Sequence, residues 1–509
     1  MPFSRASGIL LHPTSFPSPF GIGDLGQEAY NFVGFLQDSG QKIWQVLPLG
    51  PTGFGNSPYQ CYSAIAGNPL LISPDKLKDQ GLLSEEDISN IPEFPSDRVD
   101  FDSVVQFKGT LLKTAYQNFQ KDASEEQQEA FKEFYTSKAF WLDDYAFFMA
   151  LKEAHEGASW HTWDKNIAHR QPAALAEWQE RLADEILYHK FLQFLFFQQW
   201  DKLKSYANEQ GIEIFGDIPI YVSHDSSDVW AHPEIFSLDP ETYEVYLMAG
   251  VPPDYFSEDG QLWGNPVYEW EKLEEDHFLW WVQRIQSMLD MVDLIRIDHF
   301  RGLAAYWAVP QGETTARNGE WVTAPGEAFF TAIKEKLGTL PIIAEDLGVI
   351  TPDVEELRDK FEFPGMKILH FAFDSDSDNP YLPFNYNSPN WVVYTGTHDN
   401  NTTVGWFNKR SAEEQERVHR FLGGTWGNGI HWDLIRLAMS SVACMAIFPL
   451  QDILGLGEEA IMNQPGIPDG NWCWRYQAGA LTSEISDRLR EVTDIYGRTP
   501  KNQDESKDT

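Results

Sequence analysis

Cysteine is scarce in this sequence, with only Cys61, Cys444 and Cys473 among 509 residues. The three are odd in number, lie far apart and form no C-x-x-C pair, which argues against a disulfide framework and against a zinc site of the usual spacing. So few cysteines are typical of a protein in a reducing compartment. We therefore expect a cytoplasmic protein.

Basic residues are also few, with 38 Lys and Arg against 77 Asp and Glu, and the formal net charge is −39. Nucleic-acid recognition needs a basic face, so nucleic acid is disfavoured as a partner, as is an anionic membrane surface. A neutral ligand is compatible with this charge. The alternative is that the negative charge has no role in ligand binding and only keeps the protein soluble.

Long hydrophobic runs are missing as well. The most apolar stretch, ILYHKFLQFLFFQQW at residues 186–200, contains His189 and Lys190 and is too short to cross a bilayer. The N-terminal MPFSRASGILLHPTSFPSPFG has no charged region followed by a long apolar one, as a secretory signal would. We expect neither a membrane span nor export.

What the chain does contain is a series of short apolar runs, each ending in polar or Gly- and Pro-rich residues. Helix-like stretches with apolar spacings of three and four separate most of them, and this alternation predicts βαβ units around a parallel sheet. Eight such units favour a (β/α)8 TIM barrel, with a doubly wound sheet as the alternative fold. The predicted strands are residues 8–13, 43–51, 212–222, 291–300, 341–348, 366–373, 390–400 and 444–452.

Two gaps between the predicted strands are too long for simple loops. Residues 75–210 are rich in helix formers and predict a helical insertion, and residues 231–285 predict a second insertion. We expect residues 1–496 to form one catalytic barrel with these insertions. The polar tail 497–509 is predicted to be disordered.

The segment GIGDLG at residues 21–26 matches the G-x-G-x-x-G pattern of dinucleotide-binding loops. That fingerprint also requires an acid at the end of the next strand, and KIWQVLPLG carries none, because Asp38 lies in the helix before it. The pattern therefore favours a glycine-rich turn. No phosphate loop, metal-ligand cluster or Ser-His-Asp order stands out, and we expect no cofactor and no metal.

Acidic residues mark the ends of several predicted strands. Asp217 lies in GDIPIYV, Asp298 ends LIRID, Glu345 ends PIIAE, and His398 and Asp399 follow VVYTGT. In a barrel these side chains would meet at the C-terminal mouth. Each acid alone is explained by helix capping or solvation. Together, three carboxylates in one cleft suit chemistry at a glycosidic bond.

An arginine accompanies one of these acids inside a strand that otherwise reads as buried. Arg296 and Asp298 are two residues apart in LIRID and so share one face of the strand. The guanidinium favours the charged form of the carboxyl, as an attacking carboxylate requires. The alternative is a buried ion pair with a purely structural role.

Longer motifs in this order resemble those of the amylomaltases, also called disproportionating enzymes or 4-alpha-glucanotransferases, which are relatives of the alpha-amylase clan. The resemblance covers nearly the whole chain. It is carried by SGILLHPTSFPSPFGIGDLG, SPYQCYSAIAGNP, GDIPIYV, GVPPDYFSEDGQLWGNP, RIDHFRG, AEDLG, TGTHDNNTT and NWCWR.

The resemblance implies roles for the acids at the strand ends. Asp298 would be the nucleophile, Glu345 the general acid/base, and Asp399 the third acid, which holds sugar hydroxyls and stabilises the transition state. Asp217 would be part of the site. Many true amylases carry a histidine five residues after that aspartate. This chain has Val222 there, and amylomaltases also lack the histidine. The absence of this histidine points away from plain starch hydrolysis.

The resemblance also implies where a glucan is bound. The stretch PPDYFSEDGQLWGNP would cover the cleft, and its Gly, Pro and aromatic residues suit a lid better than a plain surface loop. Asn471 and the adjacent Trp472 would contact glucan from the C-terminal side. The implied substrate-binding residues are Tyr59, Asp217, Asp254, Phe256, Trp263, Arg296, His398 and Asn471.

The activity expected from this resemblance is a retaining transfer of alpha-1,4-glucan segments from donor to acceptor glucans, with cyclic glucans as a further product. One alternative is an amylase-type hydrolase with the same residues. Another is a glucan-binding protein with a dead site, although such a protein would be expected to have lost one of the three acids. The sequence does not specify the oligomeric state.

Overall fold

The computed structural model describes residues 3–253, 257–424 and 429–499. Each of the eight predicted strands is present, and all pair in parallel in the order β10-β11-β12-β1-β2-β3-β6-β9. Ala344 N donates to Pro364 O, next to β10, and so links the two ends of the sheet. The predicted (β/α)8 barrel is confirmed. Its strands are β1 Ala6–Leu10, β2 Ile43–Gln45, β3 Glu213–Pro219, β6 Leu294–Asp298, β9 Ile342–Ala344, β10 Gly365–Ile368, β11 Trp391–Tyr394 and β12 Met445–Pro449.

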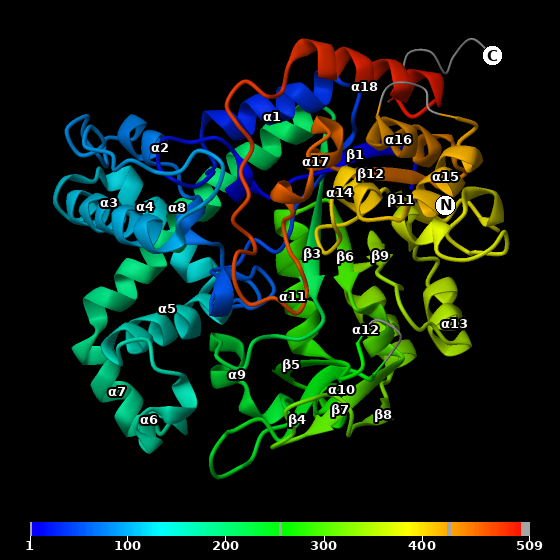
Figure 1. Ribbon diagram of the computed structural model, residues 1–509. Coiled ribbons are helices and arrows are strands. Elements are labelled where there is room, and N and C mark those ends of the chain that lie inside the picture. Colours follow the sequence, from blue (N-terminus) through cyan, green and yellow to red (C-terminus); the bar gives the residue numbers. More distant parts are fainter. Residues whose placement is uncertain (1–2, 254–256, 425–428, 500–509) are drawn as a thin grey trace.

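The barrel strands are mostly apolar because both of their faces are buried. Helices cover the outer face, and the strands' own side chains fill the inside of the barrel. Ile214, Ile295 and Ile343, on three neighbouring strands, are fully buried, as expected for a parallel sheet covered on both faces. Outside the barrel and around its mouth (Figure 1) lie α1 Gln27–Asp38, α9 Ser227–Ala231, α10 Trp270–Glu275, α11 Leu279–Met291, α12 Gly326–Leu337, α13 Pro352–Lys360, α14 Thr403–Asn408, α15 Ala412–Phe421, α16 Ile430–Ser440, α17 Leu450–Leu454 and α18 Ser483–Ile495.

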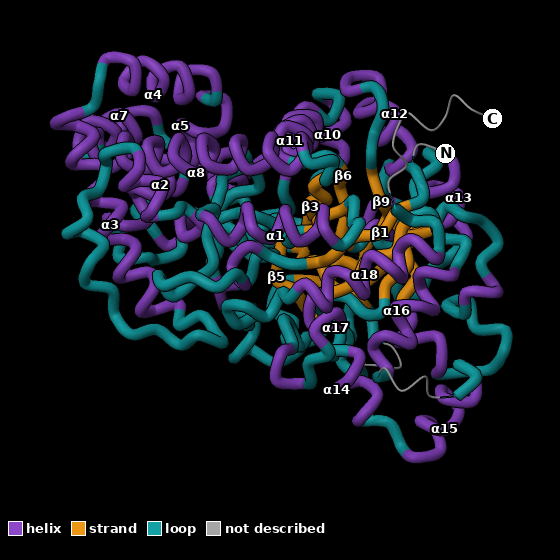
Figure 2. The backbone as a smooth tube through the Cα atoms, turned by 90° about the horizontal axis from the view of Figure 1, so that it is seen from above, coloured by secondary structure: helices purple, strands orange, loops and turns teal. Residues whose placement is uncertain are grey.

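A helical lobe stands beside the barrel and is formed by the chain between β2 and β3. Viewed from above, it lies to one side of the strands, and the long α8 runs from it to the barrel (Figure 2). Gln193 of α8 accepts a hydrogen bond from Gly67 N and donates one to Gly67 O, both at 2.8 Å. The helices of the lobe are α2 Pro74–Asp79, α3 Phe101–Asp122, α4 Glu125–Ser137, α5 Ala139–Ala154, α6 Lys165–Ala168, α7 Pro172–Arg181 and α8 Ala183–Glu209.

A second sheet, antiparallel and in the order β5-β4-β7-β8, lies near the mouth of the barrel and was not predicted. Its strands are β4 Leu247–Val251, β5 Gln261–Pro266, β7 Ala305–Pro310 and β8 Glu320–Thr323. They are short and only partly buried, so they lack the continuous apolar pattern that marks the barrel strands. Two of them fall within the stretch 231–285, for which the sequence indicated only an insertion.

Helix α13 begins with Pro352 in the first helical position, after Thr351, which has the residue type and position of a helix cap. The Thr351 side chain, however, makes no capping hydrogen bond. Its Oγ1 instead accepts a hydrogen bond from Arg301 Nη1 at 3.3 Å. Within the described part of the chain, we find no helix that is both long and apolar enough to span a membrane.

Candidate active site

The acids singled out in the sequence gather at the carboxyl end of the barrel. Asp217 lies within β3, Asp298 is the last residue of β6, Glu345 directly follows β9, and His398 and Asp399 follow β11. Because the strands are parallel, their carboxyl ends meet at one mouth. The parallel topology therefore brings together residues that are up to 182 positions apart in the chain, from Asp217 to Asp399.

Arg296 joins two of these acids. It lies opposite Asp217 in the β3–β6 register, and its Nη1 donates to Asp217 Oδ2 while its Nη2 donates to Asp298 Oδ1, both at 2.6 Å. The Arg296 side chain is only 4% exposed. Burial opposes its charge, but the two carboxylates outweigh burial and hold the pKa of Arg296 above its ordinary value. Asp298 Oδ1 is thereby fixed in place.

Glu345 has the environment of a carboxylic acid that keeps its proton. Its Oε2 accepts a hydrogen bond from His299 N at 2.7 Å, and its Oε1 accepts one from Leu347 N at 3.0 Å. Burial, reinforced by the neighbouring Asp298 carboxylate, raises the pKa of Glu345 to about 8, although Arg296 and these two backbone hydrogen bonds act in the opposite direction. His299 reaches Glu345 with its backbone because it adopts a left-handed conformation, with φ at 52°.

Asp399 has the opposite environment. Burial acts to raise its pKa, but His398, the side chain of Asn463 and Arg296 outweigh burial and lower the pKa of Asp399 to about 2. His398 Nε2 lies 3.3 Å from Asp399 Oδ2 without the alignment of a good hydrogen bond. Asn463 Nδ2 donates to Asp399 Oδ1 at 2.6 Å. Asp399 is thus an anion at neutral pH, whereas Glu345 is protonated.

Tyr59 contacts both Asp217 and His398. Its hydroxyl donates to Asp217 Oδ2 at 2.8 Å, and its ring stacks on His398 with centroids 5.2 Å apart and planes 12° apart. The Trp472 ring lies 5.8 Å from the same tyrosine. Tyr59 and Trp472 therefore form an aromatic wall beside the acids, in which Trp472 is buried and the partly exposed Tyr59 can stack on a sugar ring.

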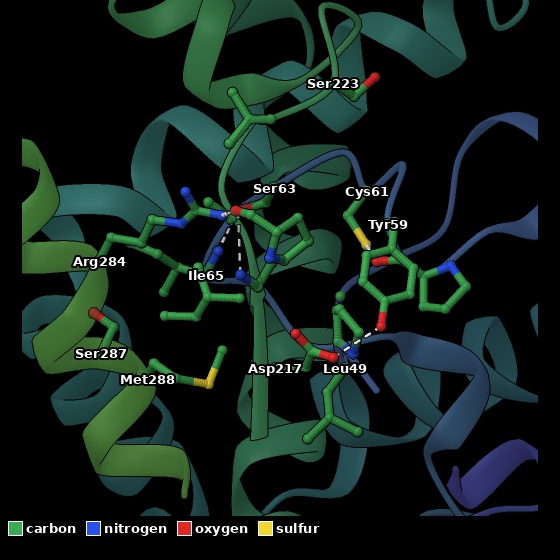
Figure 3. Close-up of a pocket in the computed structure, with 18 of the residues that line it drawn as sticks. Leu49, Tyr59, Cys61, Ser63, Ile65, Asp217, Ser223, Arg284, Ser287 and Met288 are labelled. Atoms are coloured by element: carbon green, nitrogen blue, oxygen red, sulfur yellow. Dashed lines mark hydrogen bonds between the residues drawn. The ribbon is translucent and has the colours of Figure 1, made fainter. Parts of the chain in front are cut away.

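A cavity lies on the Tyr59 side of Asp217 and is lined also by Cys61, Ser63 and Arg284 (Figure 3). Neither Asp298 nor Glu345 lines it. The second carboxylate oxygen of Asp217, Oδ1, is buried and has no hydrogen-bond partner among the described residues. Asp217 is thus held by Arg296 and Tyr59 on one oxygen, behind the acids that face the mouth.

Of the remaining predicted contacts, the structure describes Trp263 and Asn471. The Trp263 ring, on β5, packs edge-on against His299 with centroids 4.8 Å apart, which places it next to the Asp298–Glu345 pair. Asp254 and Phe256 lie outside the described residues. The Asn471 side chain accepts from Gln464 N and donates to Ile467 O. Its polar atoms therefore brace their own loop.

Some residues of the cluster were not singled out as site residues in the sequence. Asn463 lies in IMNQPG, which has no strand or helix periodicity that would direct attention to it. His12 is buried near His398, and burial lowers the pKa of His12 to about 3, so it is neutral. The described residues contain no group of three or more His, Cys, Asp or Glu side chains arranged to hold a metal ion.

Three known proteins to which this chain is similar belong to one kind of enzyme. The family described as 4-alpha-glucanotransferase matches residues 11–482. A 4-alpha-glucanotransferase from Synechocystis sp. is 60% identical over 495 residues, covering 97% of this chain and 98% of the relative. One from Thermus thermophilus is 50% identical over 505 residues, covering 98% and 100%. The structure of the amylomaltase from Streptococcus agalactiae in complex with acarbose has a TM-score of 0.94 at 42% identity, covering 97% and 100%.

Proposed function

Since this chain belongs to the 4-alpha-glucanotransferase family, we propose that it moves segments of alpha-1,4-glucan from a donor to an acceptor glucan by double displacement, with retention of configuration. The observation that carries the proposal is the contrast between carboxyls at the mouth. Glu345 is kept protonated, while Asp298 is fixed by Arg296. A retaining enzyme needs one acid and one nucleophilic carboxylate, side by side.

In the first step, Glu345 gives its proton to the glycosidic oxygen of the donor as the bond from that oxygen to the anomeric carbon breaks. Asp298 attacks the same carbon and forms a covalent glycosyl ester. Oδ1 of Asp298 is occupied by Arg296, whereas no described residue donates a hydrogen bond to Oδ2. The attacking atom is therefore Oδ2.

In the second step, the roles reverse. Glu345, now a carboxylate, accepts the proton of the 4-hydroxyl of an acceptor glucan, and that oxygen displaces Asp298 from the anomeric carbon. Glu345 is protonated again and Asp298 is free. Two inversions at the same carbon restore the original configuration. Every proton in this cycle moves through Glu345, so no metal or cofactor is assigned a step.

The other residues of the cluster bind and orient the sugar. Asp399, an anion beside the reacting carbon, accepts sugar hydroxyls and stabilises the positive charge that develops on the ring. Tyr59 supplies an aromatic face, and its hydroxyl and Arg296 hold Asp217 behind the reacting pair. Trp263 supplies a second face near Glu345.

Transfer, as opposed to hydrolysis, requires that an acceptor glucan compete successfully with water. The partly exposed aromatic residues Tyr59 and Trp263 offer apolar surface for an acceptor sugar, and the predicted covering segment with Asp254 and Phe256 would exclude water. The relatives' shared activity, 4-alpha-glucanotransferase, supports transfer over amylase-type hydrolysis.

Incubation with maltotriose tests this function. Products are resolved by chain length while reducing ends are counted. Transfer predicts glucose together with a ladder of longer maltooligosaccharides and little rise in reducing ends. If glucose and maltose accumulate with a matching rise in reducing ends, the protein is a hydrolase.

Domain organisation and location complete the proposal. We assign the catalytic unit to residues 1–496, with a helical insertion at about 75–210 and a substrate-covering loop region at about 231–285. The three described cysteines are all free thiols, which supports a reducing compartment such as the cytoplasm.

A further inference from the structure

Asp399 is held by a side chain that the proposed mechanism does not use, that of Asn463. The amide Nδ2 of Asn463 donates to Asp399 Oδ1 at 2.6 Å. The backbone N of the same residue donates to His398 O at 3.0 Å. One residue thus binds two consecutive residues of the mouth, the first through its main chain and the second through its side chain.

Asn463 belongs to a loop whose shape is independently fixed. We call residues 462–472 the C-terminal loop; it lies in the orange-red stretch between α17 and α18 in Figure 1. Trp472 N donates to Met462 O at 2.7 Å and closes the loop at its base. Inside, Asn471 Oδ1 accepts from Gln464 N at 2.9 Å and Asn471 Nδ2 donates to Ile467 O at 2.7 Å.

The base of this loop is anchored in the aromatic wall. Trp472 is 6% exposed and adopts a left-handed conformation with φ at 65°, which a bulky residue adopts only where its surroundings hold it there. Its ring lies 5.8 Å from Tyr59 and 6.0 Å from His398. The loop that carries Asn463 is therefore held in place without substrate, and the side chain of Asn463 contacts Asp399 from it.

The contact suits the charge of its partner. An amide N–H that donates to a carboxylate makes a charge-assisted hydrogen bond, which is stronger than one between neutral groups. Among the described residues, the other charged or titratable groups that face Asp399 are His398, Arg296 and Tyr59. The hydrogen bond from Asn463, at 2.6 Å, is shorter than the 3.3 Å separation between His398 Nε2 and Asp399 Oδ2.

We propose that Asn463 is the positioning residue of Asp399: its amide fixes the plane of the carboxylate, so that the remaining lone pairs of both oxygens face the sugar hydroxyls in the transition state. The proposal rests on the glucan-transfer function assigned above. Since Asp399 acts most strongly in the transition state, loss of the amide lowers kcat more than it raises KM.

The test compares Asn463→Ala with Asn463→Asp in the disproportionation of maltotriose. Both variants keep the backbone hydrogen bond to His398 O, so only the side-chain contact changes. Asn463→Ala is expected to lower kcat about 10- to 100-fold, as loss of one hydrogen bond to a charged group predicts, with KM within about threefold.

Asn463→Asp has the same shape but replaces the donor with an acceptor beside Asp399. Two carboxyls at hydrogen-bond distance cannot both ionise easily, so one of them keeps a proton to higher pH. This variant is expected to be less active than Asn463→Ala at pH 8, and its acid limb is expected to shift upward by about one pH unit or more. Asn463→Gln, which keeps the amide on a longer side chain, is expected to recover part of the loss.

Gln464→Ala is the matched control, because Gln464 is exposed and its backbone N, not its side chain, bonds to Asn471. It is expected to keep wild-type kcat and pH profile. Circular dichroism and Tm check that each variant is folded. If Asn463→Ala does not fold, the test uses the isosteric variant Asn463→Asp.

Equal activity of the Ala and Asp variants with an unchanged pH profile would overturn the proposal and leave Asn463 with a purely structural role. Failure of the proposed function would look different. In that case the wild-type protein itself would produce no ladder from maltotriose.

Discussion

At the scale of single residues, environment separates carboxyls that are chemically alike. Burial and the neighbouring Asp298 raise the pKa of Glu345 to about 8. Burial opposes ionisation of Asp399 as well, yet His398, Asn463 and Arg296 lower its pKa to about 2. This difference is what assigns the proton to Glu345 and the charge to Asp399.

The first prediction concerns the alkaline side of the pH profile. With maltotriose as donor, kcat/KM should fall about tenfold for each pH unit above about 8, because Glu345 must carry a proton to release the leaving sugar. With alpha-glucosyl fluoride, whose fluoride leaves with little protonation, the decline should disappear. Steady-state rates over pH 5–10 check this. The same decline with both donors would place the titrating group elsewhere.

The second prediction links Glu345 to stability. Its pKa is raised on folding, so the folded state holds more protons than the unfolded state between about pH 4.5 and pH 8, and stability falls as pH rises through that window. Glu345→Gln cannot ionise and escapes this loss. Its Tm should exceed that of the wild type by a few degrees at pH 9, and the difference should shrink by pH 5. A difference that is independent of pH would contradict the raised pKa.

At the scale of elements, the loop between β11 and α14 places Asp399, and a buried carboxylate holds both ends of this loop. Asp452, at 1% exposure, accepts from Thr395 Oγ1 at 2.5 Å and from Thr403 N and Oγ1, both at 2.7 Å. Thr395 precedes Asp399 and Thr403 follows it. Asp452 therefore determines where the loop begins and ends.

The third prediction is that Asp452→Ala destabilises the protein, because it leaves three buried donors without an acceptor at about 1–3 kcal/mol each. Asp452→Asn keeps one acceptor oxygen, and the threonine hydroxyls can rotate to accept from its amide, so this variant should be much milder. Thermal unfolding and kcat measure both effects. An Ala variant as stable as the Asn variant would show that the loop does not depend on this carboxylate.

The elements differ in how well the sequence predicts them. The eight barrel strands were predictable because each is largely buried on both faces and therefore mostly apolar. Strands β4, β5, β7 and β8 were not, since they are half-exposed, and β4 pairs with β7 from the far side of barrel strand β6 in the chain. Thr351 has the residue type and position of a helix cap, but its hydroxyl is used by Arg301, a contact that no local pattern reveals.

The residues of the candidate site also differ in how well the sequence predicts them. Arg296, Asp298, Glu345 and Asp399 could be identified because each stands at or near the end of an apolar strand. Asn463 could not, because it reaches Asp399 from a loop 64 residues further along the chain. Only the folded structure reveals this contact.

At the scale of the whole molecule, the helical lobe is joined to the barrel through the segment that carries Tyr59. Gly67, eight residues after Tyr59, is bound on both its N–H and its C=O by Gln193 of α8. A Cβ atom on Gly67 would lie only 2.0 Å from Cδ1 of Phe196, whose ring is fully buried. The junction therefore leaves no room for a side chain.

The fourth prediction is that Gly67→Ala lowers stability by about 1–3 kcal/mol, as overpacking of a filled core does, and reduces kcat/KM because the Tyr59 segment shifts. Gly34→Ala is the matched control. Gly34 lies inside α1 with nothing within 4 Å of an added Cβ, so this change should be neutral or stabilise by about 0.5–1 kcal/mol. Equal effects of the two substitutions on Tm would contradict the tight junction.

The central claim is that Asp298 forms a covalent bond to the donor sugar while Glu345 moves the proton. Intact-protein mass spectrometry of Glu345→Gln after exposure to alpha-glucosyl fluoride, followed by peptide mapping, tests it most directly. The account predicts that one sugar is trapped on Asp298, because the fluoride leaves without an acid and no base remains to activate an acceptor. It also predicts no adduct when Asp298→Asn is treated in the same way. A sugar found on Asp399, or no sugar on Glu345→Gln at all, would contradict the account.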